Sequence, residues 1–331
     1  MEFITNYGLF VIKLMSVVVA ILILIAGIIA TVSKGKKCKG KLDVKQLNKK
    51  YEAYRHTFFS VLGDTEEIKR YKKEAKQKKK KENKIQRRIF VIDFHGDVKA
   101  SSVQNLRETI TAVLLVAKPE DEVLVRLESA GGLVNAYGLA ASQLQRVKSA
   151  NIKLTISVDK IAASGGYMMA CVADHLIASP FSIIGSIGVI AQCPNFHRYL
   201  KNKSIDFEQV TAGKFKRTLT VFGENTEEGR KKLQAEINET HNLFKSFIQK
   251  NRRMVDVSQV ATGEYWYGTQ ALDLQLVDEL KTSDDYLLSA CKKNDLYEIN
   301  YHIKKSLPQR LAHNATNLIY NAIRHNFNVF S

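Results

Sequence analysis

The sequence lacks the residue patterns by which proteins hold metal ions or build disulfide frameworks. Its 331 residues include only four cysteines, with no CxxC pair, and eight histidines with no HExxH spacing. The cysteines are Cys38, Cys171, Cys193 and Cys291. Cys171 falls within an apolar stretch and is predicted to be a core residue. We therefore predict a chain with no metal, no cofactor and no disulfide scaffold.

Charge is absent from residues 14–32, "LMSVVVAILILIAGIIATV". A helix of this length covers about 28 Å, close to the thickness of a bilayer's hydrocarbon core. The preceding "MEFITNYG" has no positive charge and no clean small-x-small cleavage site follows, which argues against a cleaved signal peptide. The sequence therefore predicts an uncleaved transmembrane anchor over residues 1–33.

Acidic residues are scarce in the segment that follows. Residues 34–88 hold 21 lysines and arginines against 7 acidic residues, so this segment carries +14 of the chain's formal net charge of +17. Nucleic-acid binding would require basic residues on a folded face with aromatic platforms, so we predict no nucleic-acid partner. Two interpretations stay open: contact with anionic lipid headgroups, or a solvated, partly helical linker. The positive-inside rule places this basic segment in the cytoplasm.

The globular part shows strands alternating with helices and no internal repeat. Buried strands are predicted at 89–94, 122–128, 153–158 and 175–180, and helices at 102–117, 133–150, from Ser164 onward, near 195–203 and at 225–250. Residues 181–192 are apolar but too short and glycine-interrupted to span a membrane, so they are predicted to be core. This order indicates an α/β domain with largely parallel pairing.

A serine directly follows the predicted strand at 153–158, at the strand-to-helix corner "AASGG". Ser164 precedes Gly165 and Gly166, whose N–H groups could hold a tetrahedral oxyanion. A second turn, "SAGG", brings Gly131 and Gly132 to another strand end. Each turn alone is typical of an ordinary helix cap or loop. Two such turns in one domain favour acyl-transfer chemistry.

The sequence offers no histidine arrangement that would activate this serine, since His175 and His197 show no matching pattern. A lysine is the other option, and "TAGKFKRTL" supplies Lys214 and Lys216, which periodicity cannot separate. A free lysine of pKa about 10.4 is neutral in about one part in 2,500 at pH 7, a deficit of about 4.6 kcal/mol. Desolvation lowers a lysine pKa enough to make it a working base.

Five motifs in order carry a family resemblance: "LESAGG", "VDKIAASGGYMMACVAD", "GSIGV", "TAGKFKRTL" and "YGTQALDLQLVDEL". Over about residues 1–290, the chain resembles the signal peptide peptidase A family of membrane-associated serine proteases. The resemblance implies a crotonase/Clp-like ββα spiral with a Ser-Lys dyad. The "SAGG" turn has Ala130 where the family usually has proline, so it loses a fixed φ but keeps its N–H donors.

Site residues follow from the resemblance by motif. Ser164 is implied to be the nucleophile, Lys216 the general base and Ser186 the hydroxyl that orients the lysine. Gly165 and one glycine of the pair Gly131 and Gly132 are implied to form the oxyanion hole. The two dyad residues are both present, which favours a Ser-Lys endopeptidase over a catalytically silent membrane scaffold. No adenine or pantetheine signal supports a third class, an acyl-CoA enzyme.

The resemblance also implies a domain plan and a location. We expect an anchor at 1–33, a basic linker at 34–88, a peptidase domain at 89–295 and a basic tail at 296–331. The tail is either a membrane-surface helix or a contact between protomers. The expected location is the bacterial inner membrane with a single span. The positive-inside rule favours a cytoplasmic catalytic domain and the family allows a periplasmic one. The expected partners are peptide or membrane-protein substrates, the bilayer and neighbouring copies in a ring that share each dyad.

Overall fold

The computed structural model describes residues 40–63, 66, 69–70, 73 and 87–303. The predicted anchor at 1–33, much of the basic linker and the tail beyond residue 303 lie outside these residues. Within the described ranges, no helix is both long and apolar enough to cross a membrane.

The chain divides into two compact units. One comprises residues 1–42 and 301–331, of which the structure describes only the strand ends at 40–42 and 301–303. The other, Asp43–Asn300, contains the elements that build the candidate site.

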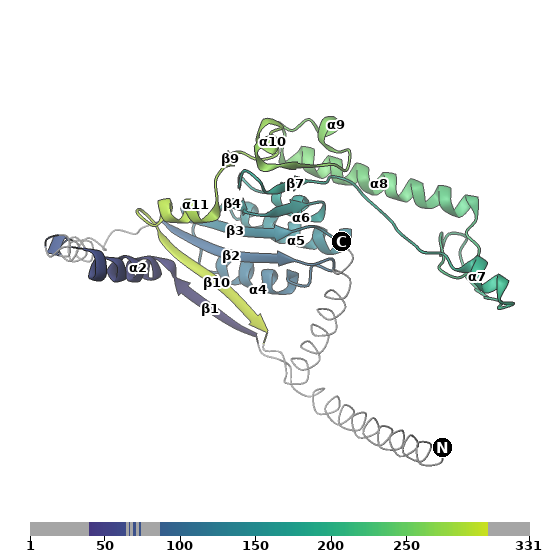
Figure 1. Ribbon diagram of the computed structural model, residues 1–331, viewed down its shortest axis with the longest axis horizontal. Helices are drawn as coiled ribbons and strands as arrows, with labels where there is room; N and C mark the ends of the chain where they lie inside the picture. Colours follow the sequence, from purple (N-terminus) through teal and green to yellow (C-terminus); the bar gives the residue numbers. More distant parts are fainter. Residues whose placement is uncertain (1–39, 64–65, 67–68, 71–72, 74–86, 304–331) are drawn as a thin grey trace, which may run out of the picture. The chain divides into compact units, whose positions relative to one another are not determined.

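The main sheet is parallel from β10 to β9 (Figure 1). Its strand order is β1-β10-β2-β3-β4-β6-β9. These strands are β1 (Gly40–Gln46), β10 (Asp295–Ile303), β2 (Arg88–Gly96), β3 (Glu122–Ser129), β4 (Lys153–Val158), β6 (His175–Ala178) and β9 (Glu279–Leu280). The helices between them are α4 (Val103–Leu114), α5 (Val134–Ser149) and α6 (Gly165–Ala170). The predicted α/β class is confirmed.

Successive side chains of the central strands point to opposite faces of the sheet and pack into two separate hydrophobic cores. Phe90 and Ile92 join the larger core with Leu144 of α5 and Tyr167 of α6. Their neighbours Ile89 and Val91 join a smaller core, together with Leu47, which begins α2 (Leu47–Leu62), and Leu287 of α11 (Ser283–Ala290). The sheet is therefore buried on both faces, which accounts for the nearly continuous apolar runs in its strands.

Three short strands branch from the main sheet and were not predicted. β5 (Ile161–Ala163) pairs with β3 and with β7 (Ile183–Gly185), and β7 pairs antiparallel with β8 (Tyr265–Tyr267). Ser164 therefore follows β5 and not β4, which corrects the prediction that it directly follows the strand at 153–158. Three-residue strands are too short to show a period in the sequence.

Residues 181–192 are only partly core, which corrects their prediction as a core segment. Ile184 and Ile187 are fully buried, whereas Phe181 and Ile190 at the two ends are 84% and 77% exposed. Only the middle of the segment is buried, because this part contains β7, which pairs with β5 and β8.

A long arm follows this segment. It contains α7 (His197–Asn202), a loop, and α8 (Glu227–Asn251). The loop and the N-terminal end of α8 extend away from the sheet (Figure 1). The N-terminal cap of α8 is Thr226, whose hydroxyl accepts a hydrogen bond from the Gly229 N–H. The Asn225 side chain, one residue before the cap, bonds the backbone of Thr220.

Two predicted domain boundaries differ from the observed elements. The segment 34–88 was expected to be a linker, yet β1 joins the main sheet and α2 starts on the smaller core. The tail was expected to begin at 296, yet β10 runs from Asp295 to Ile303 and pairs with β2. The reason is that buried Leu296 and Ile299 supply apolar surface that the sheet covers.

Candidate active site

Ser164 lies on a sharp turn between β5 and α6. Its φ of 52° and ψ of −118° are rare for a residue with a side chain. Its N–H donates to the Gly185 carbonyl at 2.8 Å, and its own carbonyl accepts from Met168 N–H at 3.0 Å. The side chain is half-buried. The hydroxyl is thus carried on a tightly fixed backbone at the end of a buried strand.

Glycine follows because no side chain fits behind the turn. A Cβ at Gly165 would lie 2.5 Å from the ring of Tyr137, and one at Gly166 would lie 2.4 Å from the Ser129 carbonyl oxygen. Both values are below any real contact of a Cβ. The two glycines therefore allow the turn to press against the end of β3 and against α5.

The "SAGG" turn after β3 meets this corner. Gly131 has φ of +88°, and a Cβ on it would lie 2.6 Å from the Gly165 nitrogen and 2.9 Å from the Ser164 Cβ. Gly132 packs on the loop after β2, where a Cβ would lie 2.1 Å from the Val98 carbonyl oxygen. The two glycine turns that were singled out in the sequence thus lie side by side around Ser164.

The hydrogen bonds of these turns separate Gly131 from Gly132. The Gly131 N–H donates to Ser129 Oγ at 3.0 Å, so it is already used. Across the described ranges, neither the Gly132 N–H nor the Gly165 N–H donates to another residue. Gly132 is also exposed, whereas Gly131 is buried. Of Gly131, Gly132 and Gly165, the glycines named for the oxyanion hole, Gly132 and Gly165 are therefore the two whose N–H groups have no acceptor within the described part of the chain.

Ser186 occupies the matching position on the neighbouring strand. Ala163 pairs with Gly185 in the parallel ladder of β5 and β7, so Ser164 and Ser186 are the next residues on each strand. Ser186 has φ of 49°, and its N–H donates to the Glu264 carbonyl at 2.7 Å. The structure thus places Ser186 beside the serine corner.

Lys216, the predicted general base, lies on the arm and not at the serine corner of the same chain. It is exposed in the loop between α7 and α8, where its N–H donates to the Gly213 carbonyl at 3.1 Å. Nearby Lys214 forms an ion pair with Glu228, 2.5 Å away, at the start of α8. Gly229 of α8 packs on this loop, and Phe244 of the same helix is buried in the core. The two residues are fifteen positions apart, which corresponds to roughly 22 Å along the helix axis.

Sequence reasoning missed the residues that hold the two turns. Ser129 accepts from Gly131 and lies 2.6 Å from the hydroxyl of Tyr137, and both side chains are buried. A serine at a strand end and a tyrosine on an apolar helix face give no signal of their own. Only the assembled fold shows that they meet.

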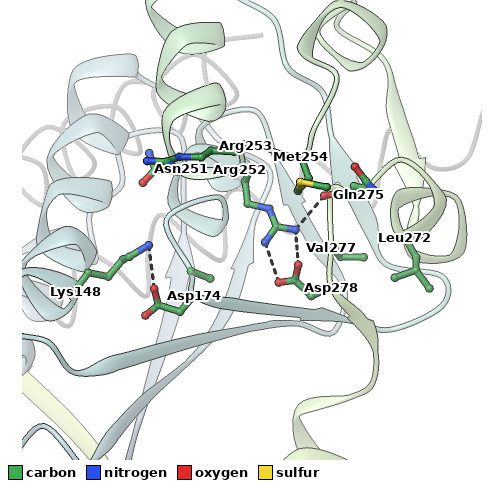
Figure 2. A pocket seen from close by; sticks show the side chains of 11 residues that line it. Lys148, Asp174, Asn251, Arg252, Arg253, Met254, Leu272, Gln275, Val277 and Asp278 are labelled. Carbon is green, nitrogen blue, oxygen red and sulfur yellow. Dashed lines mark hydrogen bonds and ion pairs between the residues drawn. The ribbon is translucent and has the colours of Figure 1, made fainter.

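A cavity of about 490 Å³ is lined by residues that directly precede β6 and β9, at the amino ends of these strands. Figure 2 shows its lining side chains. Lys148 pairs with Asp174 at 3.1 Å there, and Arg252 binds both carboxylate oxygens of Asp278 at 2.7 and 2.8 Å. Burial raises the pKa of Asp278, but hydrogen bonds from Arg252 and the Leu176 N–H outweigh it and hold the pKa below its ordinary value. These charges neutralise one another, so we assign them to holding α5 and α8 onto the sheet.

The other titratable groups near the core give no second reactive centre. Burial raises the pKa of the Cys171 thiol to about 12, which keeps it an unreactive thiol. In the part of the chain that the structure describes, no cluster of histidine, cysteine, aspartate or glutamate could hold a metal ion. The serine corner is therefore the candidate active site.

Comparisons with known proteins identify the family to which the chain belongs. Residues 2–144 match the N-terminal domain of peptidase family S49, and residues 146–297 match the peptidase family S49 domain. A Haemophilus influenzae protein named "Probable protease SohB" is 46% identical, over 97% of this chain and 96% of its own. A protein of the same name from Buchnera aphidicola subsp. Schlechtendalia chinensis is 47% identical, over 87% of this chain and 100% of its own.

Among solved structures, the chain is similar to the 1510-N membrane-bound stomatin-specific protease in complex with a substrate peptide. That likeness has a TM-score of 0.43 at 12% identity and covers 71% of this chain and 100% of the other. The family matches and the SohB relatives confirm the resemblance seen in the motifs: the chain belongs to peptidase family S49.

Proposed function

We propose that the protein is a membrane-anchored serine endopeptidase with Ser164 as its nucleophile. One observation carries this proposal. Ser164 stands on a strained turn that packs against the "SAGG" turn, and the N–H groups of Gly132 and Gly165 in these two turns have no acceptor among the described residues. Preorganised donors of this kind stabilise the oxyanion that forms when a hydroxyl attacks a peptide carbonyl.

Lys216 is the proposed general base, supplied by a neighbouring copy of the chain. In one chain its loop lies about 22 Å along α8 from the core, which leaves the serine corner without a base. The arm that carries it exposes large apolar side chains, among them Tyr199 at 61%, Ile205 at 52% and Val210 at 98%. A second protomer packed on this arm would bury them and would desolvate the lysine. A closed ring of equivalent head-to-tail contacts completes every site.

The chemistry follows from these placements. Lys216 of one protomer, in its neutral form, removes the proton from Ser164 Oγ of the next as the hydroxyl attacks the substrate carbonyl. The Gly132 and Gly165 N–H groups bind the resulting oxyanion. Ser186, beside Ser164, orients the lysine. The protonated lysine then donates to the leaving amine, and water hydrolyses the acyl-enzyme.

Apolar peptides are the proposed substrate class. Next to the exposed Gly132, Leu133 and Val98 are 51% and 66% exposed and are joined by a 2.9 Å hydrogen bond from the Leu133 N–H to the Val98 carbonyl. A charge-free anchor at 14–32 would hold this surface near the inner membrane of a bacterium, where membrane-protein fragments are the available substrates. The proposal includes the crotonase/Clp-like spiral, which the branching strands β5, β7 and β8 support.

The test is hydrolysis of an apolar peptide by the full chain in detergent. We expect no turnover from Ser164→Ala or from Lys216→Arg, because a guanidinium does not give up its proton. Ser142→Ala on the exposed face of α5 and Lys214→Arg in the same loop are the matched controls and should stay active. Turnover by folded Ser164→Ala would contradict the proposed nucleophile, and turnover by Lys216→Arg would contradict the proposed base.

A further inference from the structure

A buried tyrosine of α5 connects the turns around the serine corner. The Tyr137 hydroxyl donates to the Asp97 carbonyl at 2.7 Å and lies 2.6 Å from Ser129 Oγ. Because its hydrogen is used on the carbonyl, the serine hydroxyl must donate to the tyrosine oxygen. Ser129 Oγ in turn accepts from the Gly131 N–H at 3.0 Å. A one-directional chain of hydrogen bonds therefore runs from the Gly131 amide, through two side chains, to the loop after β2.

The ring of the same tyrosine supports the other turn. A Cβ at Gly165 would lie 2.5 Å from Cγ of Tyr137, so the Gly165 backbone rests directly on the ring. Tyr137 is fully buried. Burial also raises its pKa, so the hydroxyl keeps the proton that it donates. One rigid side chain thus contacts the "SAGG" turn through its hydroxyl and the "SGG" turn through its ring.

These two turns need such a connection. Gly132 and Gly165 are supplied by segments that follow different strands, and the residues 130–132 lie outside any helix or strand. An oxyanion hole works only when its donors are held in place before the charge develops. Ser129 alone has three staggered rotamers, and the bond to Tyr137 selects the one that accepts from Gly131.

We propose that Tyr137 is the positioning residue of the oxyanion hole. It fixes the Gly131 amide through Ser129 and backs the Gly165 peptide with its ring, so that the Gly132 and Gly165 N–H groups converge on one oxygen. It touches no substrate. This inference rests on the proposed function, since it assumes that those two N–H groups bind the oxyanion.

The test compares Tyr137→Phe with Tyr167→Phe. Tyr167 is equally buried and its hydroxyl also donates to a backbone carbonyl, that of Leu276 at 2.9 Å, which belongs to neither glycine turn. Losing one oxyanion donor costs about 100- to 1,000-fold in kcat, so misplacing one should cost about 10- to 100-fold. We expect that loss in kcat for Tyr137→Phe with KM within about threefold, and no comparable loss for Tyr167→Phe.

A peptide aldehyde gives the second readout, because its adduct with a serine hydroxyl places an oxyanion in the hole. Its inhibition constant should weaken in Tyr137→Phe in proportion to the loss in kcat/KM, as expected of a transition-state analogue. A merely structural role would lower the melting temperature of both tyrosine variants and leave the aldehyde affinity unchanged.

Ser129→Ala tests the same chain of hydrogen bonds if Tyr137→Phe fails to fold. It keeps the bond from Tyr137 to Asp97 and removes only the acceptor of the Gly131 N–H, so we expect the same loss in kcat. The double variant should lose no more kcat than either single variant, because both substitutions interrupt the same chain of hydrogen bonds.

Equal kcat and aldehyde affinity in Tyr137→Phe and Tyr167→Phe, with Ser164→Ala inactive, would overturn this inference alone. Activity in Ser164→Ala would instead overturn the proposed function.

Discussion

Ser164 and Ser186 share an uncommon backbone conformation. Both are non-glycine residues with positive φ, 52° and 49°, and they directly follow Ala163 and Gly185, the last paired residues of β5 and β7. Such residues cost about 1–3 kcal/mol each and persist where the surrounding structure fixes them. Here the hydrogen bonds from Ser164 N–H to Gly185 and from Ser186 N–H to Glu264 provide that fixation. The strained residues are therefore the two that carry the hydroxyls of the proposed site.

Ser164→Gly should therefore stabilise the protein while removing its activity. Glycine adopts φ near +52° without a steric penalty, so we expect a gain of about 0.5–1 kcal/mol in the free energy of unfolding. Chemical denaturation and peptide hydrolysis measure the two effects. Ser204→Gly, at φ of 54° in an exposed turn, should gain stability and keep its activity. A less stable Ser164→Gly would contradict the strain argument.

Gly131→Ala should have the opposite effect on stability and also abolish activity. The new Cβ would lie 2.6 Å from the Gly165 nitrogen, so the two turns would be pushed apart. We expect a loss of about 2 kcal/mol or more, from overpacking and positive φ together. Gly263→Ala is the matched control, since its φ is +91° but nothing lies within 4 Å. The account fails here if the two variants are equally active.

At the scale of elements, the long strands and helices could be predicted from sequence and the short strands could not. The strands around Phe90, Leu124 and Ile156 have six to nine residues each, enough for their apolar and β-branched residues to form a recognisable pattern. β5 and β7 have three residues each and exist only because they pair with β3, with β8 and with each other. Ser164 and Ser186 follow these strands directly, so the sequence indicated these residues of the candidate site but not the short strands that align them.

The choice between Gly131 and Gly132 illustrates the same limit. Both follow the same strand and both are glycines, so the sequence left the choice open. The structure distinguishes them through Ser129, which takes the Gly131 N–H. Likewise, spacing along the chain could not show that Lys216 lies at the far end of α8 from the core, because the direction of α8 is set by tertiary packing at Phe244 and Ile248.

The end of α8 is fastened to the start of β9 by Arg252 and Asp278, and this contact should depend on pH. Because the folded-state pKa of Asp278 lies below its ordinary value, its stabilising effect is present above about pH 4 and is lost as the pH falls through that folded-state pKa. Asp278→Asn should therefore lower the stability by about 1 kcal/mol at pH 7, since the pair is partly exposed, and by less at pH 3.

Urea denaturation of both proteins at pH 7, 4 and 3 measures this difference. Asp273→Asn, on the exposed side of α10 (Gly268–Asp273), should differ little from the parent at any pH. A stability difference for Asp278→Asn that does not shrink toward pH 3 would show that the carboxylate charge is not the cause.

At the scale of the whole molecule, one chain contains every part of the proposed site but does not assemble it. The serine corner and its two donors belong to the sheet, and the lysine belongs to an arm with exposed apolar side chains. A site divided in this way is active only in the oligomer, so activity should fall on dilution below the dissociation constant while the fold persists. The arm is then both the interface and the carrier of the base.

Complementation between two inactive chains tests this central claim most directly. Ser164→Ala and Lys216→Ala are coexpressed in equal amounts, and mixed oligomers are purified through two different tags. A site is whole when one neighbour supplies an intact serine and the other an intact lysine, so about a quarter of the parent activity should return with random mixing. No recovery in oligomers shown to contain both chains would contradict a site shared between protomers.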